Sequence, residues 1–238
     1  MGAGLSLSSM RVSPLSSRVL SELYKGGAKT ITLAPEAGSQ RLRYVIGKGI
    51  SEDDILGAVT KVAGQGIKQL KLYFMIGLPS ETDIDIEEMV ALTLKCKDIL
   101  DKSGTGCRLS LNVTPFVPKA GTPFQWLPMS DLATLNYRLA MLRKQLAPKG
   151  IKLKSESTAW SQVQGALARG DARMAEVLAD IEEISLAGWR KAIERQHLDI
   201  DFYVLDTWDV SQKLPWAMLD LGVSPAHLVC ELNRAMAQ

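Results

Sequence analysis

The sequence predicts an α/β fold, namely a curved, barrel-like parallel sheet with helices outside it, followed by a mainly helical second half. In the first half of the chain, short β-rich runs alternate with longer amphipathic helices, whereas the second half reads mostly as helix. The intervals between successive strands are long enough for helical crossovers, which indicates a parallel sheet. With 238 residues, 46% of them hydrophobic and 23% charged, the chain can bury a sizeable core.

Strands are predicted wherever apolar and polar side chains alternate, because successive side chains of a strand point to opposite faces. From Thr30 onward, Ile31 and Leu33 form an apolar face, and the runs that begin at Gln69 and Arg108 repeat this pattern. In the first run the alternation is blurred, and the last is short, with Lys152 and Lys154 outward. The predicted strands span residues 5–12, 30–36, 69–77, 108–116 and 151–155.

One face of these strands is consistently polar. A parallel sheet covered by helices on both faces reads as nearly continuous Val, Ile and Leu. We therefore expect helices on one face only and a hydrophilic lumen that holds a polar ligand; the alternative is an open sheet whose polar face lies in water. The side chains expected in the lumen on this ground are Thr32, Lys71, Tyr73, Asn112 and Thr114.

Helices are predicted from apolar residues at helical spacing and from residues that favour helix ends. Ser51 before Asp53 and Asp54 marks an N-cap with an acidic first turn, and Thr82 with Asp85 marks another. In the second half we expect breaks at residues 170–171 and at Gly188. The predicted helices span residues 16–24, 40–46, 52–63, 86–100, 131–147, 159–169 and 172–196.

Composition excludes several classes of protein. The formal net charge of +2 gives no reason to expect nucleic acid or an anionic membrane as a partner. No apolar run approaches the roughly 20 residues that span a bilayer, and no signal peptide is recognisable. We therefore expect a cytoplasmic protein. Cys96, Cys107 and Cys230 are too scattered for a metal site, so each is expected to be a small buried hydrophobe.

Polar or flexible residues follow three of the predicted strands, where β/α barrels carry their chemistry. Glu36 could accept hydrogen bonds from a hydroxyl or ammonium group, or it could cap the next helix. Gly77 would let the backbone approach a flat ligand, although a purely structural turn also explains that segment. A proline-rich loop at residues 113–124 brings Phe116 and Lys119 to the same end.

The order of these segments resembles the second half of the radical S-adenosylmethionine (SAM) domain. The motifs are LSSMRV at 7–12, EAGSQ at 36–40, IGLPSET at 76–82 and GTPF at 121–124. In particular, they are similar to those of the members that carry a cobalamin-binding domain upstream. The resemblance implies the last four βα units of a TIM-like barrel over residues 1–127 and a helical extension over 128–238.

The resemblance also implies roles for individual residues. Glu36, Ser39 and Gln40 would contact the ribose and amino-acid part of SAM. Ile76, Gly77 and Leu78 would form the wall against which adenine packs, with Phe116 near it. Substrate would meet SAM in the lumen, lined by Arg11, Thr32, Lys71, Tyr73, Asn112 and Thr114.

Radical SAM chemistry requires a 4Fe–4S cluster held by a CxxxCxxC loop, and no cysteines in this chain are closely spaced. One hypothesis is therefore that the chain is the SAM-binding and substrate-binding half of an enzyme whose cluster ligands, and a cobalamin in the full-length protein, lie elsewhere. The alternative is a non-catalytic binding or scaffold protein. A third hypothesis is a β/α-barrel lyase or aldolase in which Lys71 forms a Schiff base with the substrate. Because a partial barrel exposes strand edges, we expect a homo-oligomer or a partner that completes it.

Overall fold

A computed structural model describes residues 7–220 and 222–238 of the chain. It contains an α/β fold with a four-stranded sheet in the order β1-β2-β3-β4. β1 pairs in parallel with β2, and β3 pairs in parallel with β4, as the predicted crossovers require. Closure of this sheet into a barrel remains a prediction. The strands are β1 (Thr30–Glu36), β2 (Gln69–Ile76), β3 (Arg108–Pro115) and β4 (Lys152–Ser155).

The first predicted strand, over residues 5–12, is wrong for its described part, which begins at Leu7. That part contributes one isolated parallel bridge from Met10 to Leu33, in which the Met10 N–H donates to the Thr32 carbonyl at 2.8 Å. The segment is rich in serine and has few of the β-branched residues that favour strands. The fourth strand of the sheet is instead β4, where Leu153 pairs with Leu111.

The predicted helices of the first half are confirmed with small shifts at their ends. Ser51 caps its helix, and Asp54 completes a capping box by accepting from the Ser51 N–H at 2.8 Å. The helix expected from residue 86 begins earlier, because Thr82 is its N-cap. These helices are α1 (Ser17–Lys25), α2 (Gln40–Val45), α3 (Glu52–Ala63), α4 (Asp83–Lys102) and α5 (Leu132–Leu146).

The second half is helical as expected, but the break predicted at Gly188 is wrong. The Ser185 hydroxyl accepts from the Gly188 N–H at 3.0 Å, so Gly188 lies in the first turn of a new helix and the break falls before it. No helix in the described part is long and apolar enough to cross a membrane. After a short 3-10 helix (Ala147–Lys149) come α6 (Thr158–Arg169), α7 (Arg173–Ala179), α8 (Leu186–Arg195), α9 (Ile200–Val204) and α10 (Pro225–Met236).

The chain folds into two compact units. The first comprises residues 1–76, 80–114 and 137–155, and it contains the sheet. The second comprises residues 77–79, 115–136 and 156–238. The domain boundary expected after residue 127 remains a prediction.

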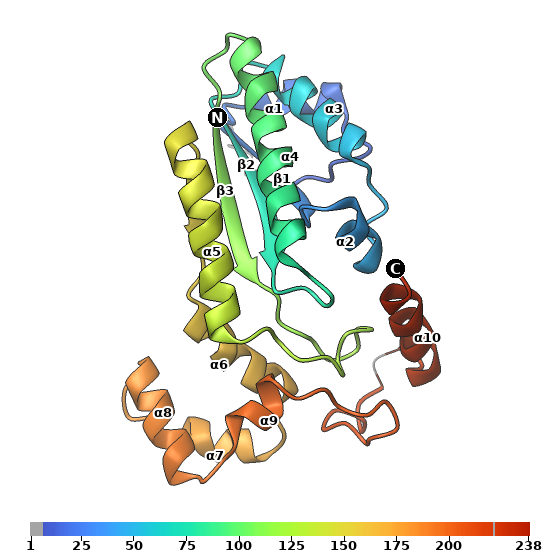
Figure 1. The fold of residues 1–238 in the computed structure, drawn as a ribbon, viewed down its shortest axis with the longest axis vertical. Coiled ribbons are helices and arrows are strands. Elements are labelled where there is room, and N and C mark those ends of the chain that lie inside the picture. The colour runs from blue at the N-terminus through green and yellow to red at the C-terminus, as the bar shows by residue number, and fades with distance from the viewer. Residues whose placement is uncertain (1–6, 221) are drawn as a thin grey trace. The chain divides into compact units, whose positions relative to one another are not determined.

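In the first unit, the apolar face of the sheet is buried, and α4 runs lengthwise along the strands (Figure 1). Leu33, Leu72 and Leu111 are each 0% exposed. On β2 the burial alternates strictly, with half-buried polar residues on the opposite face. α3 packs against α4. Helix α4 therefore covers the apolar face of the sheet, as the alternation of side chains predicts.

The second unit has an aromatic core of its own, containing Trp126, Trp189 and Trp208. Arg169 is 0% exposed and lies with its guanidinium carbon 4.0 Å from the centre of the Trp208 ring. Its nitrogens donate to the carbonyls of Leu127 and Asp206. Burial lowers the pKa of Arg169 to about 10, while the charge of Asp206 opposes this shift.

Candidate functional site

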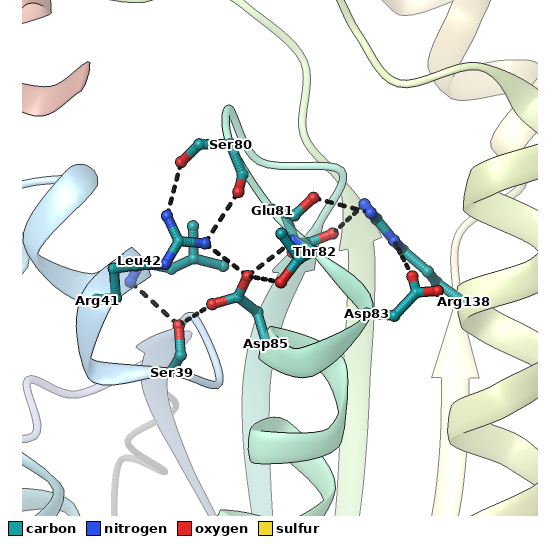
Figure 2. A network of polar contacts seen from close by, with 9 residues as sticks. All are labelled: Ser39, Arg41, Leu42, Ser80, Glu81, Thr82, Asp83, Asp85 and Arg138. Carbon is teal, nitrogen blue, oxygen red and sulfur yellow. Dashed lines mark hydrogen bonds and ion pairs between the residues drawn. The ribbon is translucent and has the colours of Figure 1, made fainter. Parts of the chain in front are cut away.

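In the first unit, the loops that follow β1 and β2 are tied together by one carboxylate, Asp85 on α4 (Figure 2). Its Oδ1 accepts from the Ser39 hydroxyl at 2.5 Å, and its Oδ2 accepts from the Arg41 guanidinium at 2.6 Å. Oδ2 also accepts from the N–H of Thr82 at 2.7 Å and from its hydroxyl at 2.8 Å. Burial favours the neutral acid, but these hydrogen bonds outweigh it and lower the pKa of Asp85.

Arg41, in the first turn of α2, makes a second connection to the loop after β2. Its guanidinium donates to the hydroxyl and to the carbonyl of Ser80, both at 2.9 Å. Ser80 has a φ of +60°, a left-handed conformation that is costly for a residue with a side chain. The two bonds from Arg41 hold Ser80 in that conformation.

Arg138 on α5 ties the loop after β2 to a third element (Figure 2). It donates to the Glu81 carboxylate at 2.7 Å, to the Glu81 carbonyl at 2.8 Å and to the Asp83 carboxylate at 3.3 Å. The Glu81 side chain is 1% exposed, so this pair is a buried one. The IGLPSET segment thus has a structural role from Ser80 onward.

Gly38 and Ser39 bring the loop after β1 close to α4. A Cβ atom on Gly38 would lie 2.3 Å from the Cβ of Met89, so only glycine permits this approach. The Ser39 hydroxyl accepts from the Leu42 N–H at 3.1 Å, which caps α2, while it donates to Asp85. The Ser39 side chain, which was predicted to contact SAM, therefore has its hydrogen-bond partners inside the first unit.

Gln40 is engaged in the same way. Its amide nitrogen donates to the Ile50 carbonyl at 3.0 Å, and its amide oxygen accepts from Arg43 at 2.9 Å. Arg43 is 1% exposed and also donates to the carbonyls of Ala37 and Gly38. Burial lowers the pKa of Arg43.

Glu36, the last residue of β1, differs from the loop that follows it. It has a φ of +71°, and the register with β2 shifts between Leu33 and Glu36, where Pro35 has no N–H to donate. Its Oε1 accepts from the Lys48 ammonium at 3.2 Å, and its side chain is 30% exposed. Its Oε2 accepts no hydrogen bond from the described residues, so this carboxylate keeps capacity for a ligand.

The polar side chains predicted for the lumen share one face of the sheet. We call this set the polar face: Thr30 and Thr32 on β1; Gln69, Lys71 and Tyr73 on β2; Ser110, Asn112 and Thr114 on β3; Lys152 and Lys154 on β4. At its amino end, Gln69 donates to Ser110 at 3.1 Å and accepts from Thr30 at 3.5 Å.

Farther along the strands, the polar face makes no such internal bonds. The side chains of Thr32, Lys71, Tyr73, Asn112 and Thr114 have no hydrogen bond or ion pair with any residue that the structure describes. Lys71 pairs in register with Thr32, and Asn112 with Lys154. Arg11 is exposed and follows the bridge residue Met10. The polar face thus holds hydrogen-bond donors that have no partner among the described residues.

The predicted adenine wall contains residues of both units. Ile76 ends β2 and is 0% exposed. Gly77 and Leu78 belong to the second unit, where a Cβ on Gly77 would lie 2.7 Å from a methyl carbon of Leu135. Phe116, also in the second unit, packs edge-to-face on Phe124 with ring centres 5.8 Å apart. Contact of these residues with adenine stays a prediction.

The three cysteines do not fit an iron–sulfur cluster. Cys96 is buried in α4, where burial raises the pKa of its thiol to about 12, and Cys107 is also buried. Cys230 is exposed on α10, which contradicts the expectation that it is buried. Among residues 7–220 and 222–238, no group of three or more His, Cys, Asp or Glu side chains is placed to hold a metal.

Sequence reasoning missed several residues of this region. Arg41 and Arg138 gave no periodic signal, because their partners lie 44 and 57 positions away along the chain. Asp85 was predicted only as a capping residue, and it does accept from the Thr82 N–H. Lys154 was read as an outward residue on a short strand, and only its pairing with Asn112 adds it to the polar face.

Comparison with known proteins agrees with the resemblance at its coarser level. Residues 4–93 match the sequence profile of the Radical SAM superfamily, so a domain of this superfamily includes β1, β2 and the first part of α4. The chain is also 38% identical over 178 residues to the uncharacterized protein MJ0966 of Methanocaldococcus jannaschii. That alignment covers 75% of this chain, and the chain spans 38% of the length of that relative.

Proposed function

We propose that the chain, in which a Radical SAM superfamily domain occupies residues 4–93, is the SAM-binding and substrate-binding part of a radical SAM enzyme. The superfamily implies SAM and a 4Fe–4S cluster as cofactors. Because the cysteines of this chain do not fit the cluster, its ligands are proposed to come from sequence outside the chain. The observation that carries the proposal is the Oε2 atom of Glu36 at the end of β1, which accepts no hydrogen bond from the described residues, while Oε1 accepts from Lys48.

In this proposal, Glu36 accepts hydrogen bonds from the ribose hydroxyls or the ammonium group of SAM. The left-handed backbone at Glu36 supports such a role, because strained residues that the fold retains gather at ligand sites. Ser39 and Gln40 act as positioning residues, since their side chains fix the loop that follows Glu36. The contacts expected of Ile76, Gly77, Leu78 and Phe116 with adenine remain part of the prediction.

Isothermal titration of the 238-residue chain with SAM tests this proposal. We expect measurable affinity, and we expect Glu36→Ala to weaken it about tenfold through loss of a charged hydrogen bond. Glu22→Gln is the matched control, because Glu22 pairs with Lys25 on the surface of α1 and should leave the affinity unchanged. Equal affinity in the Glu36→Ala and Glu22→Gln proteins would contradict the role of Glu36.

A non-catalytic binding or scaffold protein is the second candidate, favoured by the absence of a cluster ligand set in the described residues. The two candidates differ in a mixing experiment, in which a fragment that carries the superfamily's cluster loop is added to this chain. SAM binding by the mixture supports the enzyme, and no binding supports the scaffold. The same mixture tests the expected partner that completes the sheet, since β4 has a pairing partner on one side only in the described chain.

The finer assignment, to the members with an upstream cobalamin-binding domain, is likewise a proposal. Its support is the order of the four motifs along the chain. Absorbance of cobalamin in the purified full-length protein tests it, and a full-length protein that does not retain added cobalamin contradicts it.

A further inference from the structure

The second unit contains a cavity of about 570 Å³, and every residue that lines it belongs to that unit. Small-molecule sites in proteins commonly measure about 300–1,000 Å³, so the cavity has room for a ligand of that kind. The lining is mainly apolar and includes the indole rings of Trp126 and Trp216. None of the residues that are proposed to contact SAM lines it. The cavity is therefore a candidate for a second binding site.

One wall of the cavity is an indole ring whose position is fixed by two neighbours. Trp216 stacks on Trp208, with ring centres 6.1 Å apart and an angle of 26° between the planes. Its Nε1 donates to the side-chain oxygen of Gln125 at 2.8 Å. Trp208 is held in turn by the guanidinium of Arg169, which lies over its ring. An aromatic ligand can therefore pack against Trp216 without first ordering the ring, which lowers the entropy cost of binding.

The Gln125 side chain presents a hydrogen-bond donor that no described residue uses. Its Oε1 accepts from the Trp216 indole at 2.8 Å and from the Gly121 N–H at 3.0 Å, and two donors on one atom identify that atom as the amide oxygen. The Nε2 atom has no hydrogen-bond partner among the described residues. Gln125 is 3% exposed and lines the cavity, and its Nε2 is not sealed from solvent. Because a donor on a nearly buried side chain rarely lacks an acceptor, Nε2 indicates a ligand that supplies one.

The charged residues at the cavity indicate a neutral ligand. Lys213 and Asp220 line it and carry one charge of each sign, so the lining has no excess charge that would favour an ion. Val210 and Leu219 also line the cavity and are 47% and 60% exposed. A bound apolar ligand would remove part of their surface from water, which is favourable. The lining thus matches a neutral apolar molecule with a hydrogen-bond acceptor.

We propose that this cavity binds a neutral, flat aromatic molecule that packs against Trp216 and accepts a hydrogen bond from the amide nitrogen of Gln125. The ring supplies apolar contact area, and the amide selects ligands that carry an acceptor at the matching place. The proposal does not depend on the proposed function, because the cavity shares no residue with the proposed SAM site.

NMR titration of the isotopically labelled 238-residue chain tests the proposal. Naphthalene and quinoline serve as probes, because they have nearly the same shape and differ in one ring nitrogen that accepts hydrogen bonds. We expect the indole N–H signal of Trp216 to shift with both probes, and the side-chain amide signals of Gln125 to shift more with quinoline. The indole signal of Trp160, which is 42% exposed on α6 and does not line the cavity, should stay in place.

A variant isolates the hydrogen bond. Gln125→Glu keeps an oxygen that accepts from Trp216 and Gly121, but it replaces the amide donor by a second carboxylate oxygen. At pH 8, where the new carboxyl group is ionised, the ratio of quinoline affinity to naphthalene affinity should fall about tenfold, because quinoline loses its donor. Gln164→Glu is the matched control, since it introduces the same charge at an exposed position of α6 and should change the ratio less than twofold.

Three results would overturn the inference. A response of Trp216 no larger than that of Trp160 would mean that the probes do not occupy the cavity specifically. An equal affinity ratio in the two variants would exclude the hydrogen bond from Gln125, and if Gln125→Glu does not fold, equal amide shifts with the two probes in the unmodified chain would exclude it. Displacement of quinoline by SAM would assign the cavity to SAM. SAM affinity, measured separately, reports on the proposed function, so the two ideas fail independently.

Discussion

At the scale of single residues, Asp85 connects the segments that follow β1 and β2. It is 3% exposed and accepts from Ser39 and Thr82, the N-caps of α2 and α4, and from Arg41 in the first turn of α2. Because its pKa is lowered in the fold, the ionised form is the one that stabilises the native state. This contribution is complete above the pKa of the unfolded chain, about 3.9, and is lost as the pH falls through the lower pKa of the folded chain.

Asp85→Asn should therefore destabilise the protein by about 2 kcal/mol at pH 7, since the charged partner of Arg41 is lost. The deficit relative to the unmodified chain should shrink toward pH 3. Urea unfolding at both pH values measures this. Asp98→Asn, which affects an exposed pair with Lys102, should cost less than about 1 kcal/mol at either pH. A deficit that is independent of pH would contradict the role of the carboxylate charge.

Local sequence patterns reveal some residues of the candidate site and miss others. Lys71, Tyr73 and Asn112 were placed on the correct face, because alternation along a strand is a local property. Glu36 was singled out, but its strained backbone was not, because the extra residue of the β1 bulge is defined only against β2. Asp85 and Arg138 depend on partners distant in sequence, which alternation does not reveal.

At the scale of elements, the contact between the loop after β1 and helix α4 is closer than a side chain allows. Gly38 has the Cα and Cβ of Met89 within 2.6 Å of the place where its own Cβ would stand. The first predicted strand and the break at Gly188 show the opposite case. In the first case, a weak alternation yields one isolated bridge rather than a strand, and in the second, the Ser185 cap begins a new helix that contains Gly188.

Gly38→Ala should cost at least about 2 kcal/mol in the free energy of unfolding, because α4 or the loop must shift. Gly57→Ala is a matched control, since Gly57 lies inside α3 with nothing within 4 Å of its missing Cβ. That variant should gain about 0.5–1 kcal/mol from helix propensity. Chemical denaturation of both proteins measures the difference, and equal effects would contradict the close approach.

At the scale of the whole molecule, the two units differ in how they present thiols. Cys96 and Cys107 lie in the first unit and are buried, whereas Cys230 lies in the second and is exposed. Burial raises the pKa of Cys96 to about 12, which keeps it as an unreactive thiol at neutral pH.

A chromogenic disulfide reagent should therefore titrate one thiol in the native chain and three after denaturation. Cys230→Ser should abolish the native reaction and leave two thiols in denaturant. Rapid reaction of a second thiol in the native chain would show that the first unit opens at Cys96 or Cys107. The assay needs neither SAM nor a cluster, so it reports on the fold alone.

The hydrogen bonds that Arg41 donates and Asp85 accepts, which join the segments after β1 and β2, also bear on the thermodynamics of ligand binding. Loops that are already ordered lose little conformational freedom on binding, so less of the interaction energy offsets entropy. Ligand association at this end of the sheet should then show a small heat-capacity change and a rate set by diffusion and charge rather than by loop closure. Under the proposed function, these hydrogen bonds therefore bear on the rate of ligand uptake as well as on the position of the ligand.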